Sequence, residues 1–172
     1  MNKIILQGKI NNNTIEIKRA SGTIDIINFV YDKDKDMESG TLVQLSGSLK
    51  STNTDKLNVF AKITSHKLIT EVDQNQCNFA TFTGVICKSP IIRKTPLGKS
   101  IAEFMIAINE VGNNSSYIPV IAWGNITKRI ASYKVGDKFL ITGRLQSRIY
   151  TKLKVEVHTT YELSVINMEH IF

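Results

Sequence analysis

Residues 138–150 read Lys-Phe-Leu-Ile-Thr-Gly-Arg-Leu-Gln-Ser-Arg-Ile-Tyr, and this stretch decides the fold. Its period of two is typical of a half-buried β-strand. One face carries four apolar residues: Phe139, Ile141, Leu145 and Ile149. The other face carries Arg144, Arg148 and Tyr150. Arginine beside tyrosine offers cations for phosphates and flat rings for unpaired bases, so this strand predicts a nucleic-acid contact.

A second strand pattern lies upstream at residues 117–123, Tyr-Ile-Pro-Val-Ile-Ala-Trp. Alternation sends Ile118, Val120 and Ala122 to one face. Tyr117 and Trp123 lie on the other face, so the only tryptophan of the chain is not assigned to the core. The two strands together predict a surface of aromatic and basic side chains.

The chain also repeats itself. Residues 40–70 and 136–166 share eight identities at a constant offset of 96, where chance matching gives about two. The identical pairs include Gly47/Gly143, Leu49/Leu145 and Ser51/Ser147. The segment 4–10 resembles 80–86 at an offset of 76, so the second copy holds twenty additional residues after its first strand. We infer an internal duplication.

Each copy reads as five strands bounded by turn signals. They are expected near 3–11, 14–19, 23–31, 41–50 and 56–69, and near 78–88, 100–109, 116–123, 138–149 and 153–166. One helix is expected from a capping Asn125 to Lys134. This is the plan of the OB-fold, a Greek-key barrel whose exposed sheet commonly binds oligonucleotides. The prediction is an all-β chain of two tandem five-stranded OB barrels, in domains 1–72 and 77–172, the second with a short helix.

The second copy resembles the bacterial single-stranded DNA-binding proteins, which coat unwound DNA. The resemblance covers about residues 79–166 and rests on an ordered set of short motifs, among them Gly84-Val85-Ile86, Arg93-Lys94-Thr95-Pro96-Leu97-Gly98, Ala102-Glu103-Phe104, Ala122-Trp123-Gly124 and Gly143-Arg144-Leu145-Gln146-Ser147-Arg148-Ile149-Tyr150. It implies base stacking by Tyr117, Trp123 and Tyr150. It also implies backbone contacts from basic residues of this copy, namely Arg93, Lys94, Lys99, Arg144 and Arg148.

The first copy keeps the core pattern and loses this surface. Because the offset of 96 is even, strand faces can be compared directly, and Ser48, Thr52 and Thr54 stand where the second copy has Arg144, Arg148 and Tyr150. We expect a degenerate N-terminal barrel with weak DNA contact at most, although Phe29 and Tyr31 leave such a contact open. The four-barrel assembly of the resembled family implies a homodimer of this two-barrel chain.

Charge and composition narrow the function further. The net charge is +7, and residues 77–172 carry +6 of it, which favours an anionic partner of that half. Cys77 and Cys87 are expected to be free thiols, and no spacing suggests a metal site, a cofactor or a catalytic centre. No apolar run approaches the ~18 residues of a membrane span. We expect a cytoplasmic protein of bacterial, phage or mobile-element origin without a membrane partner.

The predicted function is non-enzymatic, largely sequence-independent binding of single-stranded DNA in replication, recombination or repair. The alternative is an OB-fold interaction module of a primosome or mobile-element replication complex, which binds a helicase or primase and touches DNA secondarily. RNA in place of DNA stays open, because stacking does not read the sugar. Replication or recombination proteins stay open as partners, because the sequence ends at Phe172 without the acidic tip that recruits them in the resembled family.

Overall fold

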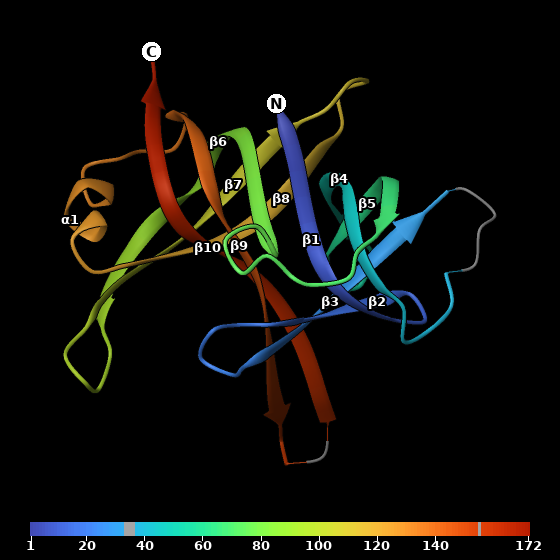
Figure 1. Ribbon diagram of the computed structural model, residues 1–172. Coiled ribbons are helices and arrows are strands. Elements are labelled where there is room, and N and C mark those ends of the chain that lie inside the picture. Colours follow the sequence, from blue (N-terminus) through green and yellow to red (C-terminus); the bar gives the residue numbers. More distant parts are fainter. Residues whose placement is uncertain (33–36, 155) are drawn as a thin grey trace.

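The computed structural model describes residues 1–32, 37–154 and 156–172, and within these residues ten strands form two barrels (Figure 1). The N-terminal barrel comprises β1 (Asn2–Asn11), β2 (Thr14–Lys18), β3 (Ile24–Tyr31), β4 (Leu42–Asn53) and β5 (Leu57–Leu68). The C-terminal barrel comprises β6 (Asn78–Lys94), β7 (Ser100–Asn109), β8 (Ser115–Trp123), β9 (Lys138–Lys152) and β10 (Glu156–Ile171). The helix α1 (Ile126–Ile130) lies between β8 and β9.

Both barrels close in the same order. In the first, β1 pairs with β2 and β4, and the parallel pairing of β3 with β5 closes the barrel. In the second, β6 pairs with β7 and β9, and the parallel pair is β8–β10. Each interior is filled by side chains of one strand face, with Leu45 and Leu49 in the first barrel and Phe82 and Phe139 in the second fully buried. The predicted all-β fold of two tandem OB barrels is confirmed.

Two glycines show why the same bend recurs in both barrels. A Cβ atom on Gly47 would lie 1.9 Å from the carbonyl oxygen of Lys62, and one on Gly143 would lie 2.4 Å from that of Ser164. Each glycine adjoins a β-bulge, so the strand bends sharply and passes close to its partner. Any larger residue there would push the two strands apart.

The strand after this bend does not follow the constant offset of the sequence comparison. Gly47 pairs with Ile63, 16 positions later, whereas Gly143 pairs with Val165, 22 positions later. The β9–β10 hairpin is therefore six residues longer than β4–β5, and the counterpart of Val59 is Tyr161. The offset of 96 is right for β4 and β9 and wrong for β5 and β10. It also sets Thr54, a turn residue after β4, against Tyr150, which lies within β9.

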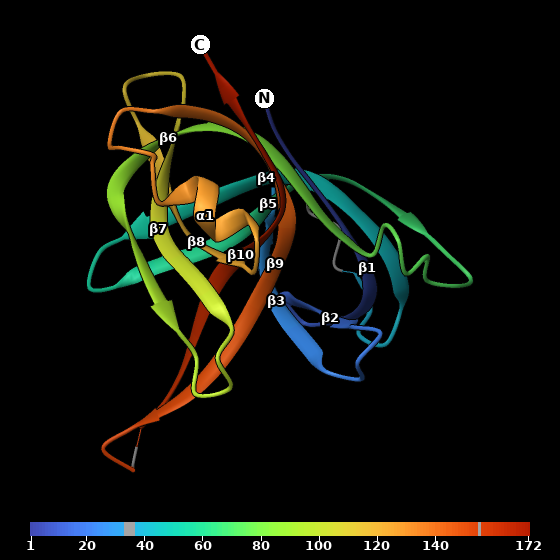
Figure 2. The ribbon, with the colours of Figure 1, turned by 90° about the vertical axis from the view of Figure 1, so that its left-hand side faces the viewer.

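Other expectations need smaller corrections. The strand β6 continues past residue 88 to Lys94 through two bulges, and it forms with β7 a hairpin arm that projects from the barrel. The helix is one short turn, and the Asn125 side chain makes no capping hydrogen bond. The middle of the polar connection expected between residues 32 and 40 lies outside the described residues. In Figure 2 the β6–β7 and β9–β10 hairpins project from the same side of the C-terminal barrel.

The two barrels are joined by strand pairing as well as by the linker. β1 pairs antiparallel with β6, so one ten-stranded sheet runs through the molecule. Ile4 and its sequence counterpart Ala80 pair with each other, which places a local pseudo-two-fold axis between them.

Within each barrel an asparagine extends the strand ladder. The Asn2 side chain accepts from the backbone N–H of Leu49 and donates to its carbonyl oxygen, at 2.9 and 2.8 Å. Asn78 makes the same two bonds with Leu145, at 2.9 and 2.6 Å.

Candidate nucleic-acid interface

Aromatic rings gather on the outward-facing side of the C-terminal barrel. Tyr117 and Trp123 stand on β8 and Tyr150 on β9, with exposed fractions of 40, 43 and 43%. Rings exposed to this extent are held in place by their neighbours and still present one side to solvent. We call the surface that they form with the outward-facing arginines Arg93 and Arg148 the aromatic face.

Strand register places the basic residues beside the rings. Ile101 pairs with Arg93 on one side and with Trp123 on the other, so the cation and the indole flank one side chain. Tyr150 pairs with His158 on β10, and the two rings stack at 5.3 Å with an interplanar angle of 25°. Arg148, two residues before Tyr150, shares its side of the strand. The aromatic face therefore contains side chains from three hairpins, β6–β7, β7–β8 and β9–β10.

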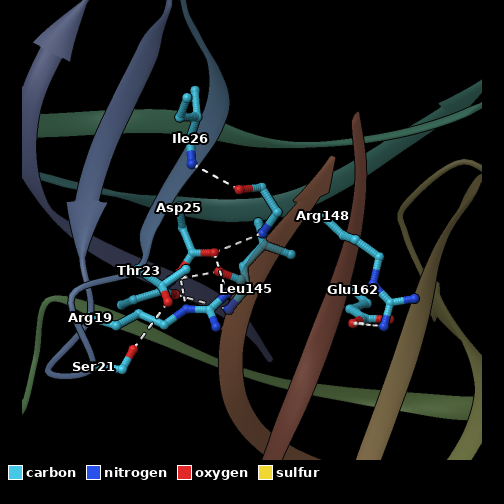
Figure 3. A network of polar contacts seen from close by, with 10 residues as sticks. Arg19, Ser21, Thr23, Asp25, Ile26, Leu145, Arg148 and Glu162 are labelled. Carbon is cyan, nitrogen blue, oxygen red and sulfur yellow. Dashed lines mark hydrogen bonds and ion pairs between the residues drawn. The ribbon is translucent and has the colours of Figure 1, made fainter. Parts of the chain in front are cut away.

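Both arginines of this face are paired with carboxylates. Arg93 donates through Nε and Nη2 to the two oxygens of Glu103, at 3.1 and 2.8 Å. These hydrogen bonds lower the pKa of the Glu103 carboxyl, and the charge of Arg148 acts in the same direction. Arg148 lies 3.7 Å from Glu162 (Figure 3). A phosphate that binds either arginine must compete with a fixed carboxylate.

The remaining predicted basic residues lie apart from this face. Arg144 is half-buried and lines a cavity of about 150 Å³ with Arg19 and Asn78, at the junction of the two barrels. Lys94 pairs with Ser100 and, by strand alternation, lies on the other side of the hairpin arm from Arg93. Lys99 is exposed in the turn of that arm. Five of the eight predicted residues lie on the outer side of the barrel, namely Arg93, Tyr117, Trp123, Arg148 and Tyr150. Strand register sets Arg93 near Trp123 and Arg148 near Tyr150, whereas Tyr117 lies six positions from Trp123 along β8.

Tyr117 is tied to the N-terminal barrel. Its backbone N–H donates to Oγ of Ser51 at 2.7 Å, and the N–H of Ser51 donates to Oγ of Ser116 at 3.1 Å. The pseudo-two-fold axis relates this contact to a matching one, made by Ile26 and Asp25 of the N-terminal barrel. There the N–H of Ile26 donates to Oγ of Ser147 at 2.9 Å, and the N–H of Ser147 donates to Asp25 at 3.0 Å.

Asp25 is fully buried and depends on one cation. Arg19 donates to its two carboxylate oxygens through Nε and Nη2, at 2.7 and 2.6 Å (Figure 3). The hydrogen bond to Asp25 raises the pKa of Arg19, and the charge of Glu162 adds to the effect. Glu162, the partner of Arg148 on the aromatic face, therefore also acts on the cation that neutralises Asp25.

Several residues of this region were absent from the sequence prediction. Glu103 stands in one of the quoted motifs and Glu162 in none, but neither was predicted to pair with an arginine, since only strand register brings them together. His158 could have been found by counting forward from Tyr150 across the turn of the β9–β10 hairpin. Phe29 and Tyr31, which left open a contact by the first copy, both lie on the strand face that points into their barrel, and Tyr31 is bonded to Nδ1 of His66 at 3.0 Å.

Within the described ranges, no group of three or more His, Cys, Asp and Glu side chains could hold a metal ion. Cys77 is buried and Cys87 half-buried, and both are free thiols, as predicted. Burial raises the pKa of each thiol. In the same part of the chain, no helix is long and apolar enough to cross a membrane.

Known proteins match this chain in two ways. The sequence profile described as the single-strand binding protein family matches residues 77–171, more than half of the chain. The chain belongs to the single-strand binding protein family. Single-stranded DNA-binding protein A of Bacillus subtilis (strain 168) is 31% identical over 80 residues, covering 42% of this chain and 46% of that protein. The single-stranded DNA-binding protein of Clostridium tetani (strain Massachusetts / E88) is 30% identical over 80 residues, covering 42% of this chain and 55% of that protein.

These matches are partial in length, since the chain spans about half of the curated relatives. The whole chain, with both barrels, has a similar fold in crystal structures of the single-stranded DNA-binding protein from Thermus aquaticus. A deletion mutant of that protein gives a TM-score of 0.76 at 16% identity, covering 100% of this chain and 95% of that chain. The wild-type protein gives a TM-score of 0.71, also at 16% identity, and 93% of it is covered.

Proposed function

We propose that this chain binds single-stranded DNA without catalysis and with little sequence preference. The observation that carries the proposal is the aromatic face, where three partly exposed rings and two arginines lie on the outer side of a barrel that matches the single-strand binding protein family. Rings of this kind stack on any base, and the arginines neutralise phosphates. Proteins with this combination serve replication, recombination or repair, and we propose such a role here.

The experiment that tests this function is a fluorescence titration. The chain has one tryptophan, so any quench by oligo-dT reports on Trp123 itself. We expect saturable quenching whose stoichiometry grows with oligonucleotide length. If about six phosphates are neutralised, the slope of log K against log salt should be near −4. Weak quenching together with tight co-purification of a helicase or primase would favour the interaction-module alternative. A parallel titration with oligo-U tests RNA.

Removal of the carboxylates on the aromatic face should tighten DNA binding. Glu103→Gln and Glu162→Gln each abolish a charge that holds an arginine of this face. We expect about two- to fivefold higher affinity for each variant and a steeper salt dependence, because a freed arginine neutralises a further phosphate and so releases more counterions from the DNA.

Glu169→Gln removes the same charge at the far end of β10 and serves as the control. Fluorescence anisotropy with a labelled oligo-dT measures all three. Equal gains in the three variants would mean that only the net charge matters, and the local competition would be refuted.

The assembly of the chain is a further part of the proposal. We propose that domains 1–72 and 77–172 form the two barrels and that two chains associate into a homodimer of four. The common barrel closure and the similarity of the whole chain to the Thermus aquaticus protein support a two-barrel unit. Sedimentation equilibrium between micromolar and nanomolar concentration tests the dimer, and a monomeric mass throughout would exclude it.

A further inference from the structure

Strand register shows which residues of the N-terminal barrel match the binding residues of the C-terminal barrel. Strand register equates the cross-strand pair Ser48–Lys62 with Arg144–Ser164. Each pair contains one cation and one serine, with the strands exchanged. The next pair equates Lys50–Phe60 with Gln146–Glu162. The N-terminal barrel therefore carries Lys50, Lys62 and Phe60 on the strand face that corresponds to Arg144 and Gln146.

These side chains line a groove between the barrels. A hollow of about 410 Å³ lies between the β4–β5 hairpin and the β7–β8 turn. We call it the inter-barrel groove. Its walls present Lys50, Phe60 and Lys62 from one barrel and Ser115 and Ser116 from the other. Phe60 is half-buried and is absent from the packed core, so its ring belongs to the groove.

The ion pairs in the groove resemble those of the aromatic face. Lys50 donates to Glu110, and Lys62 lies 3.3 Å from Asp32. Burial opposes the charge of Glu110, but hydrogen bonds from Lys50 and Ser116 outweigh it and leave the pKa of this carboxyl lowered. The side chain of Lys62 remains 46% exposed, and that of Asp32 66% exposed. A phosphate can reach Lys62 from solvent and replace such an exposed carboxylate at small cost.

The groove is continuous with the aromatic face. Ser51 lines the groove and accepts the hydrogen bond from the backbone of Tyr117, whose neighbour Ser116 forms the opposite wall. A strand stacked on Tyr117 therefore meets hydroxyl groups first and then Lys50 and Lys62. Both surfaces therefore offer the same types of group, cations beside a ring, that single-stranded nucleic acid requires.

We infer that the inter-barrel groove is a second contact for the same single strand, in which Lys50 and Lys62 bind its phosphates and Phe60 contacts a base. The inference rests on the proposed function and extends it to the N-terminal barrel. It replaces the expectation that this barrel makes weak DNA contact at most. A strand long enough to cover both surfaces uses the groove, whereas a short one fills the aromatic face alone.

The test compares oligonucleotide lengths in the double variant Lys62→Gln/Phe60→Leu. These changes remove a cation and a ring and leave Lys50 to hold Glu110. With oligo-dT on the order of 30 nucleotides, long enough for two barrels, we expect about three- to tenfold weaker binding. With on the order of 8 nucleotides, within the range for one barrel, we expect no change. Lys67→Gln removes an equal charge from the same strand outside the groove and is the control. Far-UV circular dichroism checks folding.

Each outcome decides the matter. Loss of affinity for the long oligonucleotide alone supports the groove. Unchanged binding of both lengths, equal loss for both, or the same loss in Lys67→Gln overturns it. Failure of the proposed function would look different, because the unmodified chain would then neither bind the short oligonucleotide nor show quenching of Trp123.

Discussion

Replacement of Trp123 and Tyr150 together by alanine should weaken oligo-dT binding at least tenfold. The two residues stand on different hairpins of the aromatic face and are each 43% exposed. Stacking on a well-placed ring contributes about 1–3 kcal/mol per base, so the loss of two rings exceeds the 1.4 kcal/mol of a tenfold change. The fold should persist, because neither side chain belongs to the packed core.

The measurement must not depend on the tryptophan that is removed. Anisotropy of a labelled oligonucleotide gives the affinity, and thermal unfolding followed by circular dichroism shows whether the barrel is intact. Phe172→Ala provides the control, because it deletes a fully exposed ring at the end of the chain. An affinity within twofold of the unmodified protein in the double variant would remove Trp123 and Tyr150 from the binding site.

The Asn78→Ala variant should lose about 2–4 kcal/mol of unfolding free energy. Asn78 is 8% exposed and completes the ladder between β6 and β9, where it satisfies both backbone groups of the buried Leu145. Each buried backbone group left without a partner costs about 1–3 kcal/mol. In a chain of this size, 1 kcal/mol shifts the melting temperature by about 2–4 °C.

The duplication supplies a matched comparison for this variant. Asn2 makes the same two bonds with Leu49 but is only partly buried, at the start of the first strand. Asn2→Ala should therefore cost less than Asn78→Ala in urea unfolding followed by circular dichroism. A smaller loss for Asn78→Ala than for Asn2→Ala would contradict the role of burial.

The local pattern predicted most of the fold because strand alternation and turn residues act over short distances. Leu49 and Leu145 are buried in equivalent positions, as the duplication implied. The β9–β10 hairpin is six residues longer than β4–β5, and a gap-free alignment of the two copies cannot show this difference, so residues after the turn were paired wrongly. As a result Phe60 was not matched with Glu162, and the N-terminal barrel was expected to make weak DNA contact at most.

The candidate site was predictable only where a side chain's direction follows from its own strand. Tyr117, Trp123 and Tyr150 face outward as alternation requires. Arg144 shares the outward side of its strand with Arg148, yet it lies at the junction with the other barrel, since contacts between barrels depend on how the sheet continues from β6 to β1. The pairing of Arg93 with Glu103 depends on register in the same way.

The strand pairing between β1 and β6 also has a consequence at low concentration. Two separate OB proteins joined by such a contact would come apart on dilution, and the surface that they share would disappear with them. Here both strands belong to one chain, so the effective concentration of each barrel for the other stays high whatever the amount of protein. Tyr117 and Ser51 thus remain neighbours even when few molecules are present.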